Sequence, residues 1–158
     1  MAQAIRRAIE PEDIDAVRSL FREYSDSLGI DLSFQDFPQE LAGLPGRYGP
    51  PSGCLLLATV DGGAAGCVGL RRLADGVCEM KRLYVRLRHR GTGLGRRLAE
   101  RVVWEARALG YQRVRLRTIP SLMGRAVELY RSLGFTEIDP YRDNPVEGAV
   151  FMELRLGE

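Results

Sequence analysis

A glycine-rich turn carries the strongest chemical signal in the sequence. The segment R-G-T-G-L-G, Arg90 to Gly95, separates a strand-like stretch from one with helical spacing. Glycines let a backbone approach a ligand without obstruction by Cβ atoms, and the first amides of a helix lack internal partners and carry partial positive charge. Because Arg90, Arg96 and Arg97 add charged side chains, the turn predicts a phosphate site, and a pyrophosphate fits better than a single carboxylate.

Two other phosphate-binding motifs are excluded by their spacing. A dinucleotide fingerprint needs G-x-G-x-x-G, but Arg96 occupies the third position and no early β-α-β unit precedes it. A P-loop needs a lysine after its last glycine, and Lys81 is the only lysine in the chain. What remains is R-x-x-G-x-G, a weak signal alone because many glycine turns serve only the fold.

Glu79 is the first candidate for proton transfer. It alternates with Val77, Leu83 and Val85 in the predicted strand Val77 to Val85, which indicates a carboxylate on an otherwise apolar face. Such a carboxylate is usually either paired or directed into a cleft. We therefore weigh an ion pair with a neighbouring arginine against a general base.

Tyr130 is the second candidate. It shares a helix flank with Val127 and Met123, which lie three and seven residues earlier, respectively. The side chain is therefore either the edge of a core or a hydroxyl that donates a proton.

Other reactive side chains favour plainer interpretations. His89, the single histidine, lies beside the glycine turn, so phosphate contact or exposure is favoured over catalysis. Cys78 is predicted to point away from Glu79, and we expect Trp104 to pack near the apolar stripe of its helix. The three cysteines, at 54, 67 and 78, lack the close spacing of metal sites or disulfide frameworks and are predicted to be buried thiols.

The periodicity of apolar residues predicts the elements that must position these groups. Helices are expected to begin at Pro11, near Phe34, at Leu94 and at Pro120. The order predicts an α/β (α+β) fold with a mixed, mostly antiparallel, central sheet of about seven strands and helices on both faces. The predicted strands are Ala4–Ile9, Cys54–Val60, Ala65–Leu73, Val77–Val85, Gln112–Thr118, Phe135–Ile138 and Ala149–Leu156.

Length and composition limit the function. At 158 residues with 45% hydrophobic and 28% charged residues, the chain is predicted to form one domain, residues 1–158. The longest apolar run, Cys54 to Val60, is too short to span a membrane, and no secretory signal is evident, so a cytoplasmic protein is expected. The net charge is only +2, but the segment from Lys81 to Arg101 contains eight basic residues and only one acidic residue. This local excess predicts an anionic partner.

Two motifs together resemble the GNAT superfamily of acetyl-CoA-dependent N-acetyltransferases. They are K-R-L-Y-V followed by the turn at Arg90 to Gly95, and A-V-E-L-Y-R-S-L-G-F at Ala126 to Phe135. The resemblance covers nearly the whole order of elements. It implies acetyl-CoA as co-substrate and no metal. It also implies that the strand Val77 to Val85 splays from the strand Gln112 to Thr118, with the thioester in the gap.

The resemblance also implies roles for individual residues. Glu79 would act as base, often through water, and the Tyr130 hydroxyl would donate to the departing sulfur. A backbone N–H of Leu83 or Tyr84 would polarise the thioester carbonyl. Met123 stands where many members have an asparagine that contacts the cofactor. The implied cofactor-binding residues are Leu83, Tyr84, Val85, Arg90, Gly91, Thr92, Gly93, Leu94, Gly95, Arg96 and Met123.

The acceptor is expected to enter opposite the cofactor, between Tyr24 and Tyr48 and along the loop Asp139 to Gly148. Acidic and aromatic groups there suit a small-molecule primary amine, although a solvated helix face and an Asx-rich turn explain the same residues. These groups are Asp26, Asp31, Asp36, Glu40, Asp139, Tyr141, Asp143 and Asn144.

Three alternatives stay open beside this hypothesis. One is a non-catalytic acyl-CoA-binding module, and another is a protein or peptide N-acetyltransferase. Nucleic-acid binding is disfavoured because few aromatic residues accompany the arginines; neither nucleic acid nor membrane is an expected partner. A homodimer is possible, with Ala149 to Leu156 as a pairing edge.

Overall fold

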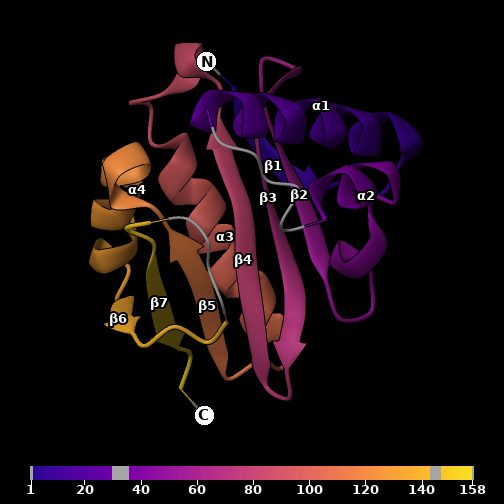
Figure 1. Cartoon of the computed structure of the whole chain (residues 1–158). Helices are drawn as coiled ribbons and strands as arrows, with labels where there is room; N and C mark the ends of the chain where they lie inside the picture. Colours follow the sequence, from indigo (N-terminus) through magenta and orange to yellow (C-terminus); the bar gives the residue numbers. More distant parts are fainter. Residues whose placement is uncertain (1, 30–35, 143–146, 158) are drawn as a thin grey trace.

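Seven strands form one sheet, seen in the computed structural model, which describes residues 2–29, 36–142 and 147–157 (Figure 1). The spatial order is β1-β2-β3-β4-β5-β7-β6. The number of strands and the mixed, mostly antiparallel pairing confirm the predicted fold class. The strands are β1 (Gln3–Arg7), β2 (Cys54–Val60), β3 (Gly63–Ala74), β4 (Val77–Val85), β5 (Arg113–Thr118), β6 (Thr136–Ile138) and β7 (Val150–Arg155).

Helices cover both faces of this sheet. The helices α1 (Pro11–Leu28), α2 (Phe37–Ala42) and the 3-10 turn η2 (Gly46–Tyr48) pack with one buried cluster, and α3 (Leu94–Ala108) and α4 (Pro120–Ser132) pack with the other. A further 3-10 turn, η3, spans Leu87–His89. The start of α1 at Pro11 and its left-handed Gly29 stop agree with the sequence prediction.

The middle of the sheet opens where β4 meets β5. These two strands are parallel, and their pairing covers only Val77–Glu79 of β4 and Arg113–Arg115 of β5. Every other neighbouring pair is antiparallel. Beyond this short ladder no pairing joins the two strands among the described residues, so the predicted splay is confirmed.

A β-bulge interrupts β4. Lys81 pairs with Gly69 and Tyr84 pairs with Cys67, so two residues of β4 oppose one residue of β3 at this point. The backbone of Arg82 has a φ of 63°, the left-handed region that non-glycine residues rarely adopt. The bulge reverses the alternation of side chains along the second half of the strand.

This reversal corrects the predicted face of Glu79. Cys78 and Met80 belong to the core cluster under α3 and α4, so Glu79 between them points to the opposite face. Leu83 and Val85, beyond the bulge, pack against that same α3 and α4 cluster. The expectation that Glu79 shares a face with Leu83 and Val85 is therefore wrong.

Two further expectations are also wrong. The strand β7 pairs with β5 along its length and with β6 at residues 151–153, so Ala149 to Leu156 is not the edge strand of the sheet that was expected for pairing. Trp104 does not pack in the core, since it is 60% exposed beneath the guanidinium of Arg101. The prediction of buried thiols is confirmed for all three cysteines. Within the described ranges, no helix has the length and apolar content needed to cross a membrane.

Candidate active site

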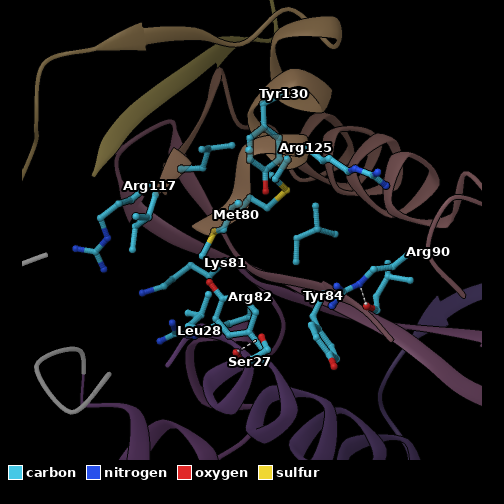
Figure 2. Close-up of a pocket in the computed structure, with 18 of the residues that line it drawn as sticks. Ser27, Leu28, Met80, Lys81, Arg82, Tyr84, Arg90, Arg117, Arg125 and Tyr130 are labelled. Atoms are coloured by element: carbon cyan, nitrogen blue, oxygen red, sulfur yellow. Dashed lines mark hydrogen bonds between the residues drawn. The ribbon is translucent and has the colours of Figure 1, made fainter. Parts of the chain in front are cut away.

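A cavity of about 400 Å³ lies where β4 and β5 separate (Figure 2). It is formed by the second half of β4, the end of β5, the start of α4 and the end of α1. Lys81 and Arg117 lie at one end and Arg90 at the other. The predicted site residues that line it are Glu79, Leu83, Tyr84, Val85, Arg90, Met123 and Tyr130.

The glycine turn forms the start of α3. Gly91 and Gly93 have φ angles of 77° and 85°, so both need the left-handed backbone that glycine tolerates. The first helical hydrogen bond runs from Arg97 N to Gly93 O. The amides of residues 94–96 therefore precede it and have no acceptor within the helix. This arrangement of amides fits a phosphate group.

The side chains of the turn are engaged elsewhere. Thr92 Oγ1 donates to the carbonyl of His89 at 2.6 Å, and Arg96 Nη2 donates to Ser132 Oγ at 2.6 Å. Leu94 is 1% exposed and belongs to the core. The turn is therefore suited to bind an anion through its backbone, and Gly95 and the two preceding glycines keep that backbone bare.

Arg90 connects the turn to the cavity. Its Nε atom lies 2.9 Å from the carbonyl oxygen of Val85, and its guanidinium carbon lies 5.8 Å from the centroid of the Tyr84 ring. The Arg90 side chain therefore extends along the end of β4 and places positive charge at the cavity's mouth.

Glu79 is held by four hydrogen bonds. Arg71 donates to Oε1 from Nε at 3.1 Å and from Nη2 at 3.0 Å. The Tyr141 hydroxyl and Arg142 Nη2 donate to Oε2 at 2.7 and 2.6 Å. Burial alone would raise the pKa of this carboxyl, which is 2% exposed, but Lys81 and these donors outweigh burial and lower it. Glu79 is therefore an ionised, ion-paired carboxylate in the cavity wall.

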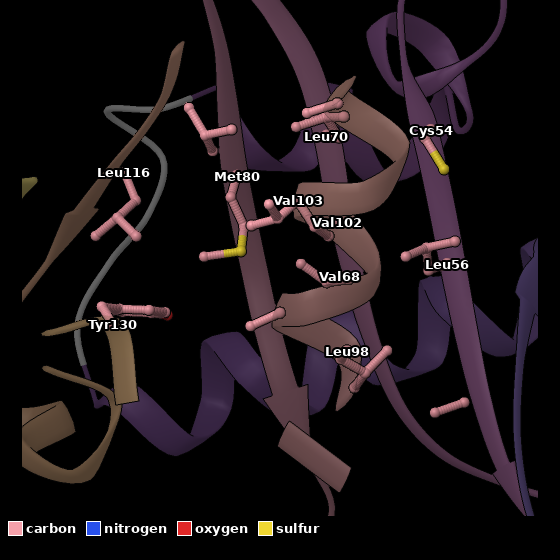
Figure 3. Close-up of a cluster of buried hydrophobic side chains, with 14 of the residues drawn as sticks. Cys54, Leu56, Val68, Leu70, Met80, Leu98, Val102, Val103, Leu116 and Tyr130 are labelled. Carbon is pink, nitrogen blue, oxygen red and sulfur yellow. The ribbon is translucent and has the colours of Figure 1, made fainter. Parts of the chain in front are cut away.

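Tyr130 lies at the border between core and cavity. Its ring packs against Phe135 at 5.8 Å between centroids, beside Leu116 and Met80 (Figure 3). The ring points into the cavity in Figure 2. Burial raises the pKa of its phenol, so the hydroxyl keeps its proton at neutral pH and is able to donate it.

The fold and its cavity have counterparts among known proteins. The model of the acetyltransferase (GNAT) family matches residues 14–135. This chain belongs to the GNAT acetyltransferase family. An uncharacterised N-acetyltransferase of Schizosaccharomyces pombe is 41% identical over 150 residues, which cover 94% of this chain and 91% of the yeast protein. This GNAT chain is therefore an acyltransferase enzyme of the N-acetyltransferase type, as the motifs predicted.

Solved structures show the same fold. A GNAT-family acetyltransferase from Staphylococcus aureus matches with a TM-score of 0.82 at 20% identity, over 98% of this chain and 99% of that one. An acetyltransferase from Salmonella typhimurium, solved with its cofactor acetyl-CoA, matches with a TM-score of 0.72 at 23% identity, over 100% of this chain and 96% of that one.

Met123 marks a kink in the fourth helix of this GNAT chain. Its φ and ψ angles of −137° and 41° are not helical, and Thr118 Oγ1 lies 3.6 Å from its sulfur. The residue lines the cavity. Because a thioether is a weak acceptor and has no donor, Met123 contacts a ligand differently from an asparagine amide.

Several basic residues of the site were not predicted from the sequence. Lys81 and Arg117 line the cavity, and Arg71 and Arg142 bind Glu79. Burial, together with the charges of Arg82 and Arg71, lowers the pKa of Lys81 to about 6. The basic run from Lys81 onward indicated an anionic partner, but no local pattern indicated that Arg142 would reach this site.

The acceptor side differs from the acidic wall that was expected. Glu40 forms an ion pair with Arg82, and Asp26, Asp36 and Asp139 are exposed. Three of the predicted residues, Asp31, Asp143 and Asn144, lie outside the described residues. Among the predicted groups, Asp36 and Glu40 line a neighbouring cavity, and Tyr141 reaches the site through its hydrogen bond to Glu79.

A second cavity adjoins the first on this acceptor side. Its volume is about 470 Å³, and it is lined by α2, η2, Arg71 and Arg142. The Glu79 ion pairs separate the two cavities, because Glu79 lines the first while both of its arginine partners line the second. Among the described residues, three arginines (Arg47, Arg71 and Arg142) and two of the predicted carboxylates (Asp36 and Glu40) line this cavity, so its wall is more basic than was expected.

Proposed function

We propose that this chain transfers the acetyl group of acetyl-CoA to a primary amine of a small molecule. The observation that carries the proposal is the cavity between the separated ends of β4 and β5, which Glu79 and Tyr130 both line. The glycine turn at the start of α3 follows directly from β4. Two adjoining cavities of about 400 and 470 Å³ are suited to small molecules.

The chain's own groups fit acetyl-CoA, which would supply the acetyl group as a reactive thioester. The amides at residues 94–96 and the open backbone of Gly91 and Gly93 suit its pyrophosphate. The β4 residues Leu83 to Val85 line the cavity that would take the pantetheine arm. An N–H of Leu83 or Tyr84 is the proposed donor to the thioester carbonyl.

Deprotonation of the amine is the first chemical requirement. An alkyl amine with a pKa near 10.4 is only about 0.04% neutral at pH 7, which adds roughly 4.6 kcal/mol to the apparent barrier. Glu79 is the proposed base, directly or through water; its four hydrogen-bond donors and its lowered pKa make it a weak base. Lys81 lines the same cavity, and its pKa of about 6 supports a second group that accepts a proton there.

Departure of the thiol completes the reaction. The amine nitrogen forms a bond to the acetyl carbon, the carbon–sulfur bond breaks, and Tyr130 is proposed to donate its phenolic proton to the leaving sulfur. The ammonium group loses one proton to the base before the attack. The second proton, which the nitrogen loses as the amide forms, returns to the Tyr130 phenolate. Since a thiol has a pKa near 8.5, its thiolate already leaves readily, and the acid gives a moderate acceleration.

Calorimetric titration with acetyl-CoA and CoA tests the cofactor site. We expect binding by the wild-type protein, and loss of binding in Arg90→Glu and Gly93→Trp. Absence of binding by folded wild-type protein would contradict the proposal.

An acceptor screen that measures CoA release tests the reaction itself. Small amines and peptides form its two arms, with Glu79→Gln and Tyr130→Phe as variants. Transfer to small amines supports the proposal, and transfer to peptides alone favours a protein acetyltransferase. Binding of acetyl-CoA without turnover on any acceptor indicates a non-catalytic module.

A further inference from the structure

Positive charge gathers at the acceptor end of the site. Lys81 and Arg117 lie at the end of the first cavity opposite Arg90 (Figure 2). Arg47, Arg71 and Arg142 line the second cavity. Within the described part of the chain, this end of the two cavities is lined by five arginines and three carboxylates: Arg47, Arg71, Arg82, Arg117 and Arg142, and Asp36, Glu40 and Glu79. The ion pairs of Glu79 and Glu40 therefore leave an excess of positive charge.

The close arrangement of these arginines is electrostatically unfavourable when no anion lies among them. Burial lowers the pKa of Arg47, and the neighbouring Arg71 lowers it further. Burial likewise lowers the pKa of Arg117, with Arg142 as the next cause. Like charges that depress each other's pKa are stabilised when an anion binds among them. The excess charge therefore favours an anionic ligand over a cationic one.

Hydrogen-bond donors accompany this charge. A guanidinium has five N–H donors, and the bonds that Arg71 makes to Glu79 use only its Nε and Nη2 atoms. Arg47 donates from Nη2 to the carbonyl of Arg72. Tyr48 also lines the second cavity, but its hydroxyl is buried beside the Glu40 carboxylate. The guanidinium groups are therefore the suitable donor set for a carboxylate.

We infer that the acceptor is an amine that carries a carboxylate, most favourably an amino acid with two carboxylates, and that Arg47, Arg71 and Arg142 bind those carboxylates. The inference rests on the proposed acetyltransferase function and names the substrate class. The amine nitrogen would lie in the first cavity near Lys81, and the carboxylates would reach the arginines of the second at the boundary that Glu79, Arg71 and Arg142 form. Glu79 would then have a positioning role as well, because it orients Arg71 and Arg142.

A comparison of acceptors tests the inference directly. Steady-state kinetics of CoA release would be measured for aspartate and glutamate, for their diamides, and for the diamine putrescine. We expect kcat/KM for the dicarboxylates to exceed that for the diamides and for putrescine by 100-fold or more. No transfer to either dicarboxylate, or a higher kcat/KM for putrescine or the diamides, would overturn the inference.

The variant Arg47→Gln is the second test, because Arg47 lines the second cavity and no hydrogen bond or ion pair to Glu79 is described for it. We expect its KM for the dicarboxylate to rise 10-fold or more, with KM for acetyl-CoA and thermal stability within twofold and 3 °C, respectively, of wild type. The exposed Arg107 gives a matched control, Arg107→Gln. An equal loss for dicarboxylates and diamides in Arg47→Gln would contradict carboxylate binding at this residue.

Different results would contradict the proposed acetyltransferase function and the inferred substrate class. If the folded protein does not bind acetyl-CoA, the proposed function fails and the inference fails with it. If it binds acetyl-CoA and acetylates neutral or cationic amines best, the proposed function stands and only the inference is overturned.

Discussion

Arg142 Nη2 lies 2.6 Å from Glu79 Oε2, although the two residues are 63 positions apart in the chain. Arg71 holds the other oxygen of the same carboxylate from the neighbouring strand. Glu79 thus joins the central sheet to the segment that follows β6 and separates the two cavities. A change at this position should affect both the chemistry and the stability of the protein.

Glu79→Gln should lower kcat/KM for acetyl transfer by about 100-fold, because the variant lacks the carboxylate that accepts the proton. Its free energy of unfolding should also fall by about 3 kcal/mol, because two arginines lose their partner. Kinetics and urea denaturation measure the two effects. The control is Glu105→Gln, since Glu105 is equally buried and ion-paired with Arg7 and Arg101 but lies outside both cavities. Equal activity losses in the two variants would argue against a catalytic role.

Tyr130→Phe should lower kcat by about 10- to 100-fold, at or below the low end of general acid catalysis, because a thiolate leaves readily. The KM for acetyl-CoA and the melting temperature should change little. The control is Tyr111→Phe, whose hydroxyl bonds the carbonyl of Ser52 away from the cavity. A Tyr130→Phe enzyme with wild-type kcat would remove this residue from the mechanism.

Gly93→Ala should weaken CoA binding by about 10-fold, because a Cβ costs about 1–2 kcal/mol in the left-handed conformation and distorts the turn. Calorimetric titration measures the Kd. Gly29→Ala is the control, because Gly29 also has a positive φ and open space around it but ends α1. The Gly29→Ala variant should lose about as much stability as Gly93→Ala but keep the wild-type Kd for CoA. If Gly29→Ala also bound CoA more weakly, the effect of Gly93→Ala would be a general effect on folding.

The variant Lys81→Met should have a higher free energy of unfolding than the wild type at pH 7. This difference should shrink toward pH 10. The pKa of Lys81 is about 6 in the folded protein, below its ordinary value of 10.5. Between these values the unfolded chain binds the additional proton, so the wild-type free energy of unfolding rises with pH, by up to about 1.4 kcal/mol per pH unit. Urea denaturation at pH 7 and pH 9.5 measures the change. A difference that is independent of pH would show that Lys81 titrates normally.

Local patterns in the sequence predicted the elements and the glycine turn. The periods of apolar residues, Pro11 and Gly29 at the ends of α1, and the turn before Leu94 depend on neighbours a few residues away. The strand pattern and the family resemblance also singled out Glu79 and Tyr130, which the structure brings to one cavity. These features were predictable because their physical causes are local.

The tertiary structure decided how those elements are combined into a site. A two-residue turn at Asp75 and Gly76 without a bulge would place Arg72 opposite Glu79, but an additional residue at Leu73 brings Arg71 there instead. A single-residue shift moves each side chain beyond it to the other face of a strand. The bulge at Arg82 has the same effect on Leu83 and Val85.

The basic acceptor side also depends on the tertiary structure. Arg47, Arg71 and Arg142 belong to three distant segments and line one cavity only because the sheet and its loops bring them together. The sequence by itself determined the family, the elements and the turn. The partners of Glu79 and the charge of the acceptor cavity follow from strand register and long-range packing, which no local pattern encodes.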